Sequence, residues 1–191
     1  MATAATLLLL SMWSLAAAAS GITSAYTDLD IDKCKLVNQS QGEGEWAEWQ
    51  CPGLKGNFVR VSEDDLRYTV SYGRDAEHQC AAQQTFGKFN YLGPRIEWRL
   101  ENGRPFATIL RWYQSSDEVK TNWLVVTKYD GIEACHVAYV DPALPNANAV
   151  ARQKADDIAR AFNCSNDKPQ IVSQKTIQLE EIVSGWPCPV E

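Results

Sequence analysis

The chain has 191 residues, a formal net charge of −6, six cysteines and two histidines. An acidic chain has no electrostatic attraction to nucleic acid or to anionic lipid surfaces, so we expect neither as a partner. The charge suits a cationic partner, and it is also what ordinary solubility requires.

The first 20 residues have the composition of a secretory signal peptide. Leu7–Leu10 and Trp13–Ala19 form an apolar stretch that ends in small residues, although no Lys or Arg precedes it. The stretch is shorter than the roughly 20 apolar residues that span a membrane, and no later segment is long enough. We therefore predict a secreted or periplasmic protein in which residues 1–20 are removed and residues 21–191 form one domain.

All six cysteines follow the predicted signal, and an even number in an exported chain indicates three disulfides. The order of the predicted elements along the chain favours three pairs, which are Cys34–Cys51, Cys80–Cys188 and Cys135–Cys164. The spacings between cysteines are not those of zinc sites, and we predict no metal and no other cofactor.

The first part of the mature chain predicts short strands connected by polar loops. The extended patterns lie at Tyr26–Asp32, Cys34–Val37, Trp46–Cys51, Phe58–Val61 and Leu66–Tyr72. Gly73–Gly93 has no periodicity and predicts a long irregular segment. Its aromatic residues either cover the open end of a sheet or form a ligand-binding loop.

The stretch Pro94–Val140 is the richest in apolar and β-branched residues and predicts the central antiparallel sheet. Two hairpins are expected, with turns at Asn102-Gly103 and Asp130-Gly131. Two registers are compatible with the first hairpin. A two-residue turn places Trp98 on one face with Ala107 and Ile109, whereas a three-residue turn places it with Phe106, Thr108 and Leu110.

After Asp141-Pro142 the apolar period becomes helical. One stripe contains Ala147, Val150, Ala151, Ala155, Ile158 and Phe162. Asn146 or Asn148 is expected to cap the start, and Ile171–Val183 is expected to add an edge strand. The predicted fold class is therefore α+β, an antiparallel β-sheet with one covering C-terminal helix, stapled by disulfides.

The sequence contains no catalytic motif of high specificity. His136 lies in a predicted strand, where a packed histidine is commoner than a general base, and His78 lies in the irregular segment. The serine elbow of α/β-hydrolases, its βαβ units and the phosphate-binding glycine motifs are all missing. Asp64 and Asp65 are adjacent near a strand start, where aspartates shape a turn more often than they form a glycosidase pair.

Five residues are the candidate ligand contacts. Arg95, Glu97 and Arg99 form a row of alternating charge on one strand face, which either recognises a polar partner or is a solvated surface. If the helix covers this face, Glu97 must pair with one of these two arginines, because an isolated buried charge is too costly. Phe86 and Tyr91 of the irregular segment complete the set.

These features favour a non-enzymatic, exported binding protein of the cell envelope or periplasm, with a protein or carbohydrate partner. Net charge and size also suit an inhibitor of a cationic secreted hydrolase such as lysozyme. The third alternative is a small envelope hydrolase that uses two carboxylates across one cleft. A structure in which no acid pair lines a pocket would exclude it. No residue pattern specifies the ligand or the oligomeric state.

Overall fold

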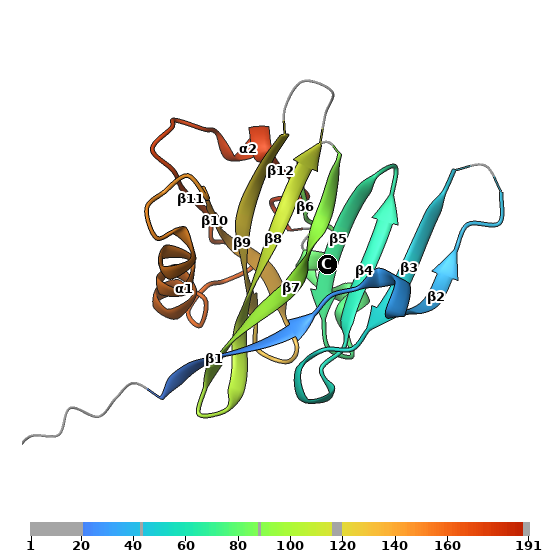
Figure 1. The fold of residues 1–191 in the computed structure, drawn as a ribbon, viewed down its shortest axis with the longest axis horizontal. Helices are drawn as coiled ribbons and strands as arrows, with labels where there is room; N and C mark the ends of the chain where they lie inside the picture. The colour runs from blue at the N-terminus through green and yellow to red at the C-terminus, as the bar shows by residue number, and fades with distance from the viewer. Residues whose placement is uncertain (1–20, 43, 88, 116–119, 189–191) are drawn as a thin grey trace, which may run out of the picture.

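A computed structural model describes residues 21–42, 44–87, 89–115 and 120–188, and the predicted signal peptide lies outside them (Figure 1). No helix in these ranges is long and apolar enough to cross a membrane. The helices and strands follow one another along the chain as β1 (Ile22–Asp28), β2 (Lys35–Gln39), β3 (Trp46–Cys51), β4 (Val59–Asp64), β5 (Arg67–Tyr72), β6 (Thr85–Phe86), β7 (Asn90–Glu101), β8 (Arg104–Ser115), β9 (Lys120–Tyr129), β10 (Ala134–Val140), α1 (Ala147–Ile158), β11 (Gln170–Val172), α2 (Leu179–Ile182) and β12 (Val183–Ser184).

These elements form three layers. The first layer is a four-stranded sheet in the order β2-β3-β4-β5, and the second is a six-stranded sheet in the order β1-β7-β8-β9-β10-β11. Helix α1 covers the opposite face of the six-stranded sheet as the third layer (Figure 1). This arrangement confirms the predicted α+β class with one main covering helix.

Large aromatic residues fill the core between the two sheets. Tyr72 of the four-stranded sheet lies edge-on to Trp98 of the six-stranded sheet, with ring centroids 5.5 Å apart, and Tyr129 contacts both rings. All three side chains are buried. Burial raises the pKa of Tyr72 to about 12, although hydrogen bonds with Thr108 and Thr127 partly oppose the shift. Aromatic contacts of this kind join the two sheets into one unit.

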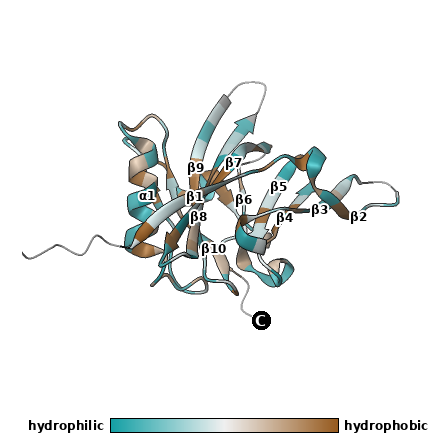
Figure 2. Cartoon of the chain, turned by 60° about the horizontal axis from the view of Figure 1, so that its bottom comes forward, coloured by the Kyte–Doolittle hydropathy of each residue, from teal (hydrophilic) through white to brown (hydrophobic). Residues whose placement is uncertain are grey.

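Small side chains let helix α1 approach the six-stranded sheet closely. Ala147, Ala151, Ala155 and Ala159 recur every four residues on the buried face. Figure 2 shows both hydrophilic and hydrophobic residues along α1, as expected of an amphipathic helix with one buried face. Most of the predicted stripe is confirmed, but the helix ends at Ile158, before Phe162.

The predicted cap at the start of this helix is wrong. Asn146 adopts the left-handed conformation (φ 58°) and makes no side-chain capping bond. Its carbonyl oxygen instead accepts hydrogen bonds from the amides of Ala149 and Val150. Asn148 lies inside the helix and accepts a hydrogen bond from Arg111. A backbone carbonyl therefore satisfies the Ala149 amide that a side-chain cap would have bound.

The hairpin between β7 and β8 combines features of both expected registers. Its turn has two residues, with Glu101 opposite Arg104, but an extra residue in β8 shifts the pairing immediately afterwards. Trp98 consequently lies opposite Thr108, as the three-residue alternative predicted. A β-bulge after the turn produces this result, because it inserts one residue into a single strand.

The tail of the chain departs from the purely antiparallel expectation. Ile171–Val183 was expected to add an edge strand, and β11 does so over Gln170–Val172, but it runs parallel to β10. β10, α1 and β11 therefore form a βαβ unit, so the prediction that such units are missing is wrong. The rest of the tail forms α2 and β12, and β12 pairs with β6 in a separate two-stranded sheet.

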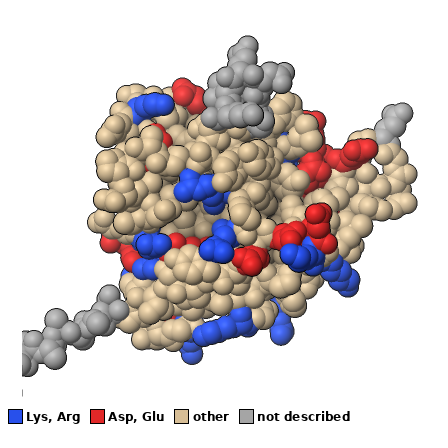
Figure 3. Space-filling view, viewed as in Figure 1, with Lys and Arg blue, Asp and Glu red and all other residues tan. Residues whose placement is uncertain are grey.

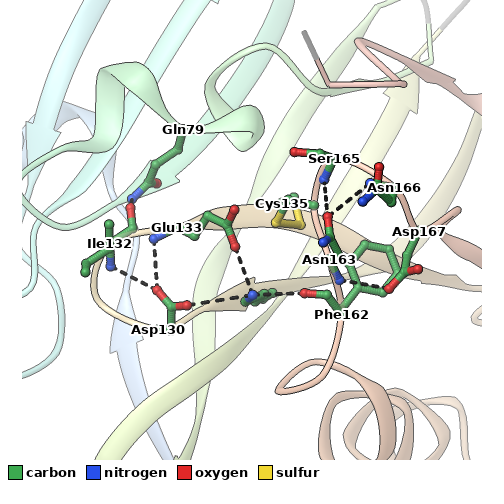
Figure 4. A network of polar contacts seen from close by, with 12 residues as sticks. Gln79, Asp130, Ile132, Glu133, Cys135, Phe162, Asn163, Ser165, Asn166 and Asp167 are labelled. Atoms are coloured by element: carbon green, nitrogen blue, oxygen red, sulfur yellow. Dashed lines mark hydrogen bonds and ion pairs between the residues drawn. A yellow bond between two sulfur atoms is a disulfide. The ribbon is translucent and has the colours of Figure 1, made fainter. Parts of the chain in front are cut away.

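A buried lysine holds the segment after α1 against the β9–β10 turn (Figure 4). The Lys128 ammonium donates to the carbonyl oxygen of Phe162 and to a carboxylate oxygen of Glu133, both at 2.9 Å. Asp130 accepts hydrogen bonds from the amides of Ile132 and Glu133, which closes the turn. The network satisfies an amine that would be costly to bury alone.

The three predicted disulfides are all present. Cys34–Cys51 joins β3 to the segment before β2, Cys135–Cys164 joins β10 to the segment after α1, and Cys80–Cys188 joins the middle of the chain to its tail. Three formed disulfides fit an oxidising compartment.

The disulfide that closes the longest segment should contribute most to stability. Cys80–Cys188 spans 108 residues and Cys34–Cys51 spans 17. In the chain-entropy model, replacing both cysteines with serine should therefore cost about 5 kcal/mol for the first and about 3 kcal/mol for the second. Guanidinium unfolding without reductant measures both variants. An equal loss, or the reverse order, would contradict the prediction.

Candidate functional site

A pocket of about 270 Å³, which we call the arginine pocket, lies where helix α1 meets β1, β7, β8 and β9. Its lining residues are Tyr26, Gly93, Pro94, Arg95, Glu97, Ile109, Arg111, Tyr113, Leu124, Asn148 and Arg152. Three arginines and one carboxylate give this lining a positive formal charge, whereas the chain as a whole carries −6. In Figure 3, basic side chains gather around a hollow in the middle of the face viewed.

A bend in β7 forms one wall of the pocket. The pairing with β8 shifts between Leu92 and Ile96, so that three residues of β7 lie opposite Arg111 alone. A Cβ atom on Gly93 would lie 2.9 Å from the carbonyl oxygen of Arg111, so glycine is required for this close approach. The irregular pairing also suits Pro94, which has no amide proton to donate to the sheet.

Arg152 comes from helix α1 and is held by two partners. Its Nε donates to Glu97 Oε1 at 2.6 Å, and Nη2 donates to the Tyr26 hydroxyl at 3.2 Å. The hydrogen bond to Glu97 is the main reason that the pKa of Arg152 is raised above its ordinary value. The guanidinium is therefore charged and oriented before any ligand arrives.

Glu97 lies at the centre of a buried charge network beneath the helix. Besides Arg152, its carboxylate accepts a hydrogen bond from Ser24 Oγ at 2.5 Å. The Ser24 hydroxyl in turn accepts from Arg99, whose Nε and Nη2 donate to the two carboxylate oxygens of Asp156 at 2.9 and 2.5 Å. We call these five residues the charged layer.

The solvated-face alternative is wrong for two residues of the predicted charge row. Glu97 and Arg99 are each only 8% exposed, because helix α1 covers them. Glu97 is paired, as a covered face requires, but its nearest partner is Arg152 of the helix at 2.6 Å. Arg99 of the predicted row lies farther away, with Nη1 at 3.9 Å from the same oxygen. Arg95 remains exposed at the pocket rim, with its Nε 3.6 Å from a carboxylate oxygen of Asp28.

Arg111 is the arginine best placed to meet a ligand. Its guanidinium donates to the side-chain oxygens of Asn122 and Asn148, both neutral amides. Within the described part of the chain, no carboxylate forms an ion pair with it. Among the described residues, its charge is therefore oriented by neutral amides and met by no carboxylate, an arrangement that suits an anionic group.

Two stacked tyrosines form the wall next to Arg111. Tyr113 lines the pocket and lies opposite Tyr91 in the β7–β8 pairing. The two rings are nearly parallel, with an interplanar angle of 6° and centroids 4.8 Å apart. Tyr91 is half exposed and supports Tyr113 from behind, so this predicted contact residue lies beside the pocket without lining it.

Phe86 is not available to a ligand, contrary to expectation. Its side chain is fully buried between the sheets and stacks on Tyr139 at 6.2 Å. The six-stranded sheet separates it from the arginine pocket. Of the two predicted contacts in the irregular segment, Phe86 covers the core, as one alternative predicted, and Tyr91 lies beside the pocket by stacking on Tyr113.

Four residues of the pocket were not predicted from the sequence, namely Arg111, Arg152, Tyr26 and Tyr113. Arg111 did carry a signal, because it is the one charged residue in the otherwise apolar and aromatic run Pro105–Tyr113. Arg152 falls outside the predicted apolar stripe of the helix, so the stripe gives no sign that its side chain reaches the sheet. Neither residue could be placed near Glu97 without knowing where the helix lies on the sheet.

His136 is a packed residue, as expected of a strand histidine. It is buried, its Nδ1 lies 2.7 Å from the Tyr139 hydroxyl, and its ring meets Trp112 edge-on. Burial lowers the pKa of His136 to about 3, so the ring is neutral at physiological pH. Among the described residues, no group of three or more His, Cys, Asp or Glu could hold a metal ion.

Comparison with known protein families, curated proteins and solved structures finds no match to this chain.

Breaking the charged layer should destabilise the fold. Asp156→Ala should lower the free energy of unfolding by about 3 kcal/mol, because it leaves the buried Arg99 without its bidentate partner. The adjacent, exposed Asp157→Ala is the matched control and should change stability by less than about 0.5 kcal/mol. Urea unfolding of both variants measures the difference, and equal effects would show that the ion pair contributes nothing.

The buried histidine should make stability depend on pH. The unfolded chain protonates His136 below pH 6.5 and the folded protein does so only near pH 3, so stability falls as the pH drops between these values. Between pH 7 and pH 5 the loss from this residue should be about 2 kcal/mol. His136→Gln should lack that part of the pH dependence in parallel denaturation curves. Identical pH dependence in both proteins would refute the assignment.

Proposed function

We propose that the protein is an exported, non-enzymatic binding protein of the cell envelope or periplasm. We further propose that the arginine pocket holds the carboxylate or phosphate group of a small ligand. The observation that carries this proposal is the Arg111 guanidinium, which is oriented by neutral amides and faces a pocket that Arg152 also lines.

The geometry around the two arginines suits a compact anionic group. A guanidinium presents a planar fork of donors that matches carboxylate and phosphate oxygens. Asn148 is the second residue of helix α1 and also lines the pocket, so the positive end of the helix dipole lies beside it. The Tyr113 ring offers an apolar surface for the rest of the ligand. A volume of about 270 Å³ accommodates a small molecule.

The disulfides support the proposed compartment. Three bridges among six cysteines leave no free thiol in the described chain, which is the pattern of proteins that fold in oxidising environments. The apolar segment at residues 1–20 supports export through a signal peptide.

The hydrolase alternative has carboxylates in two hollows of the described chain. Asp28, Asp30 and Asp32 line one hollow, where Asp28 pairs with Arg95 and Asp30 with Lys33. Glu48 and Glu77 line the same groove on the four-stranded sheet, so the condition that would exclude this alternative is not met. Arg60, however, lies between them, with its guanidinium nitrogens 2.6 Å from Glu48 and 3.6 Å from Glu77. Both carboxylates are therefore already paired with a cation, which favours binding over cleavage.

The inhibitor alternative receives little support from the placement of charge. Asp28 and Asp30 belong to the acidic segment near the amino end, but each already pairs with a basic residue of the chain, Arg95 at 3.6 Å and Lys33 at 2.6 Å. The arginine pocket carries the opposite charge and would not attract a cationic hydrolase.

The proposal predicts that Arg111→Gln weakens anion binding. Isothermal titration with inorganic phosphate and with acetate at low salt should detect binding of at least one anion to the mature protein. Arg111→Gln should reduce the affinity at least ten-fold, since a charge-assisted hydrogen bond contributes roughly 1.5–3 kcal/mol. Arg104, an exposed residue at the start of β8, provides the control, and Arg104→Gln should bind like the unaltered protein.

The two probes also separate the ligand classes. Stronger binding of phosphate points to a phosphorylated ligand, and stronger binding of acetate points to a carboxylic acid. If neither anion binds, or if Arg104→Gln and Arg111→Gln lose affinity equally, the arginine pocket is not the binding site.

A further inference from the structure

The outer face of the four-stranded sheet carries a second hollow, remote from helix α1. It consists of two adjoining cavities of about 450 and 200 Å³ that share Glu48, Arg60 and Glu77. We call the combined hollow the sheet groove. Its size lies within the roughly 300–1,000 Å³ range of small-molecule sites.

Strand register places polar side chains along the floor of the sheet groove. Arg60 of β4 lies between Gln50 of β3 and Ser71 of β5. Two residues further along the same two strands, Glu48 of β3 lies opposite Ser62 of β4. Because residues two apart on a strand project from the same face, these side chains all point away from the core.

The segment between β5 and β6 forms a wall over this floor. It contains two short 3₁₀ helices, Ala76–His78 and Cys80–Ala82, and contributes Glu77 to the groove. The Cys80–Cys188 disulfide lies in the same segment and fastens it to the tail of the chain. The wall is therefore fixed covalently.

The charges in the sheet groove balance one another. Glu48 and Glu77 both contact Arg60, and Arg74 lines the same hollow. The side chains of Arg60 and Glu48 are only 22% and 19% exposed, which holds them in fixed orientations. A balanced lining has no preference for an anion or a cation, in contrast to the arginine pocket.

We infer that the sheet groove binds a neutral sugar, a hexose or N-acetylhexosamine glycoside. The amides of Gln50 and Asn38 each present donors and acceptors, which matches hydroxyl groups that both donate and accept. Phe58 is 41% exposed at the groove and offers an aromatic face to the C–H side of a sugar ring. This site is separate from the arginine pocket and does not depend on the function proposed above.

Saturation-transfer NMR with four probes tests the inference on the mature protein. The probes are the methyl glycosides of glucose, galactose, mannose and N-acetylglucosamine. At least one should receive saturation from the protein, and Gln50→Ala should lower its affinity at least ten-fold. Gln39→Ala is the matched control, because Gln39 lies at the exposed sheet edge and is not among the groove residues. It should change the affinity less than two-fold.

A second variant protects the test against a misfolded protein. Glu48→Gln keeps the shape of the side chain, removes one carboxylate beside Arg60 and should also lower the affinity at least ten-fold. Arg111→Gln should leave sugar binding unchanged, which separates this site from the arginine pocket. The inference is overturned if none of the four glycosides receives saturation. It is also overturned if Gln50→Ala and Glu48→Gln both bind like the unaltered protein, or if glucuronate binds more tightly than methyl glucoside.

Discussion

The charged layer between β7 and helix α1 is the constraint on which the rest of this face depends. Glu97 and Arg99 project from the sheet beneath the helix, and neither could be buried without a partner of opposite charge. Arg152 and Asp156 supply these partners from positions four residues apart on one helix face. Alanine packing alone would tolerate a helix displaced along the sheet, whereas the two ion pairs are compatible with one placement.

The arginine pocket follows from that placement together with the bend in β7. The ion pair with Glu97 brings Arg152 to the pocket, and the extra residues at Gly93–Arg95 carry the strand away from regular pairing beside Arg111. Each arginine is thus held by a different part of the fold, one by the helix and one by β8. A site assembled from several rigid elements keeps its geometry without a ligand, which reduces the entropy lost on binding.

Local sequence patterns were sufficient for the features that depend on nearby residues. Alternation around Trp98 predicted a strand with Glu97 and Arg99 on one face, and the order of elements along the chain predicted which cysteines pair. The bulges in β7 and β8 left no such pattern, because an inserted residue changes the alternation only relative to its partner strand. The parallel pairing of β11 was equally hidden, since a three-residue strand is too short to show its direction.

The site required information about positions far apart in the chain. Ser24, Glu97 and Arg152 meet only because β1 pairs with β7 and the helix crosses both. The burial of Phe86 was equally hidden, because a lone aromatic residue in an irregular segment has no periodic pattern that indicates where its side chain points. Its burial depends on β6 lying against β5 and over Tyr139, which are remote in sequence.

If the arginine pocket binds an anion as proposed, the net charge of the protein should favour a small anion over a large one. Charges on the surface are screened beyond about 8 Å at physiological ionic strength, so a small anion inside the pocket interacts mainly with Arg111 and Arg152. Nucleic acid or an anionic membrane would cover a much larger area of a chain whose net charge is −6. The absence of attraction to polyanions that the composition implies is therefore compatible with a pocket for a single anionic group. The sheet groove lacks this selection, because its own charges are balanced.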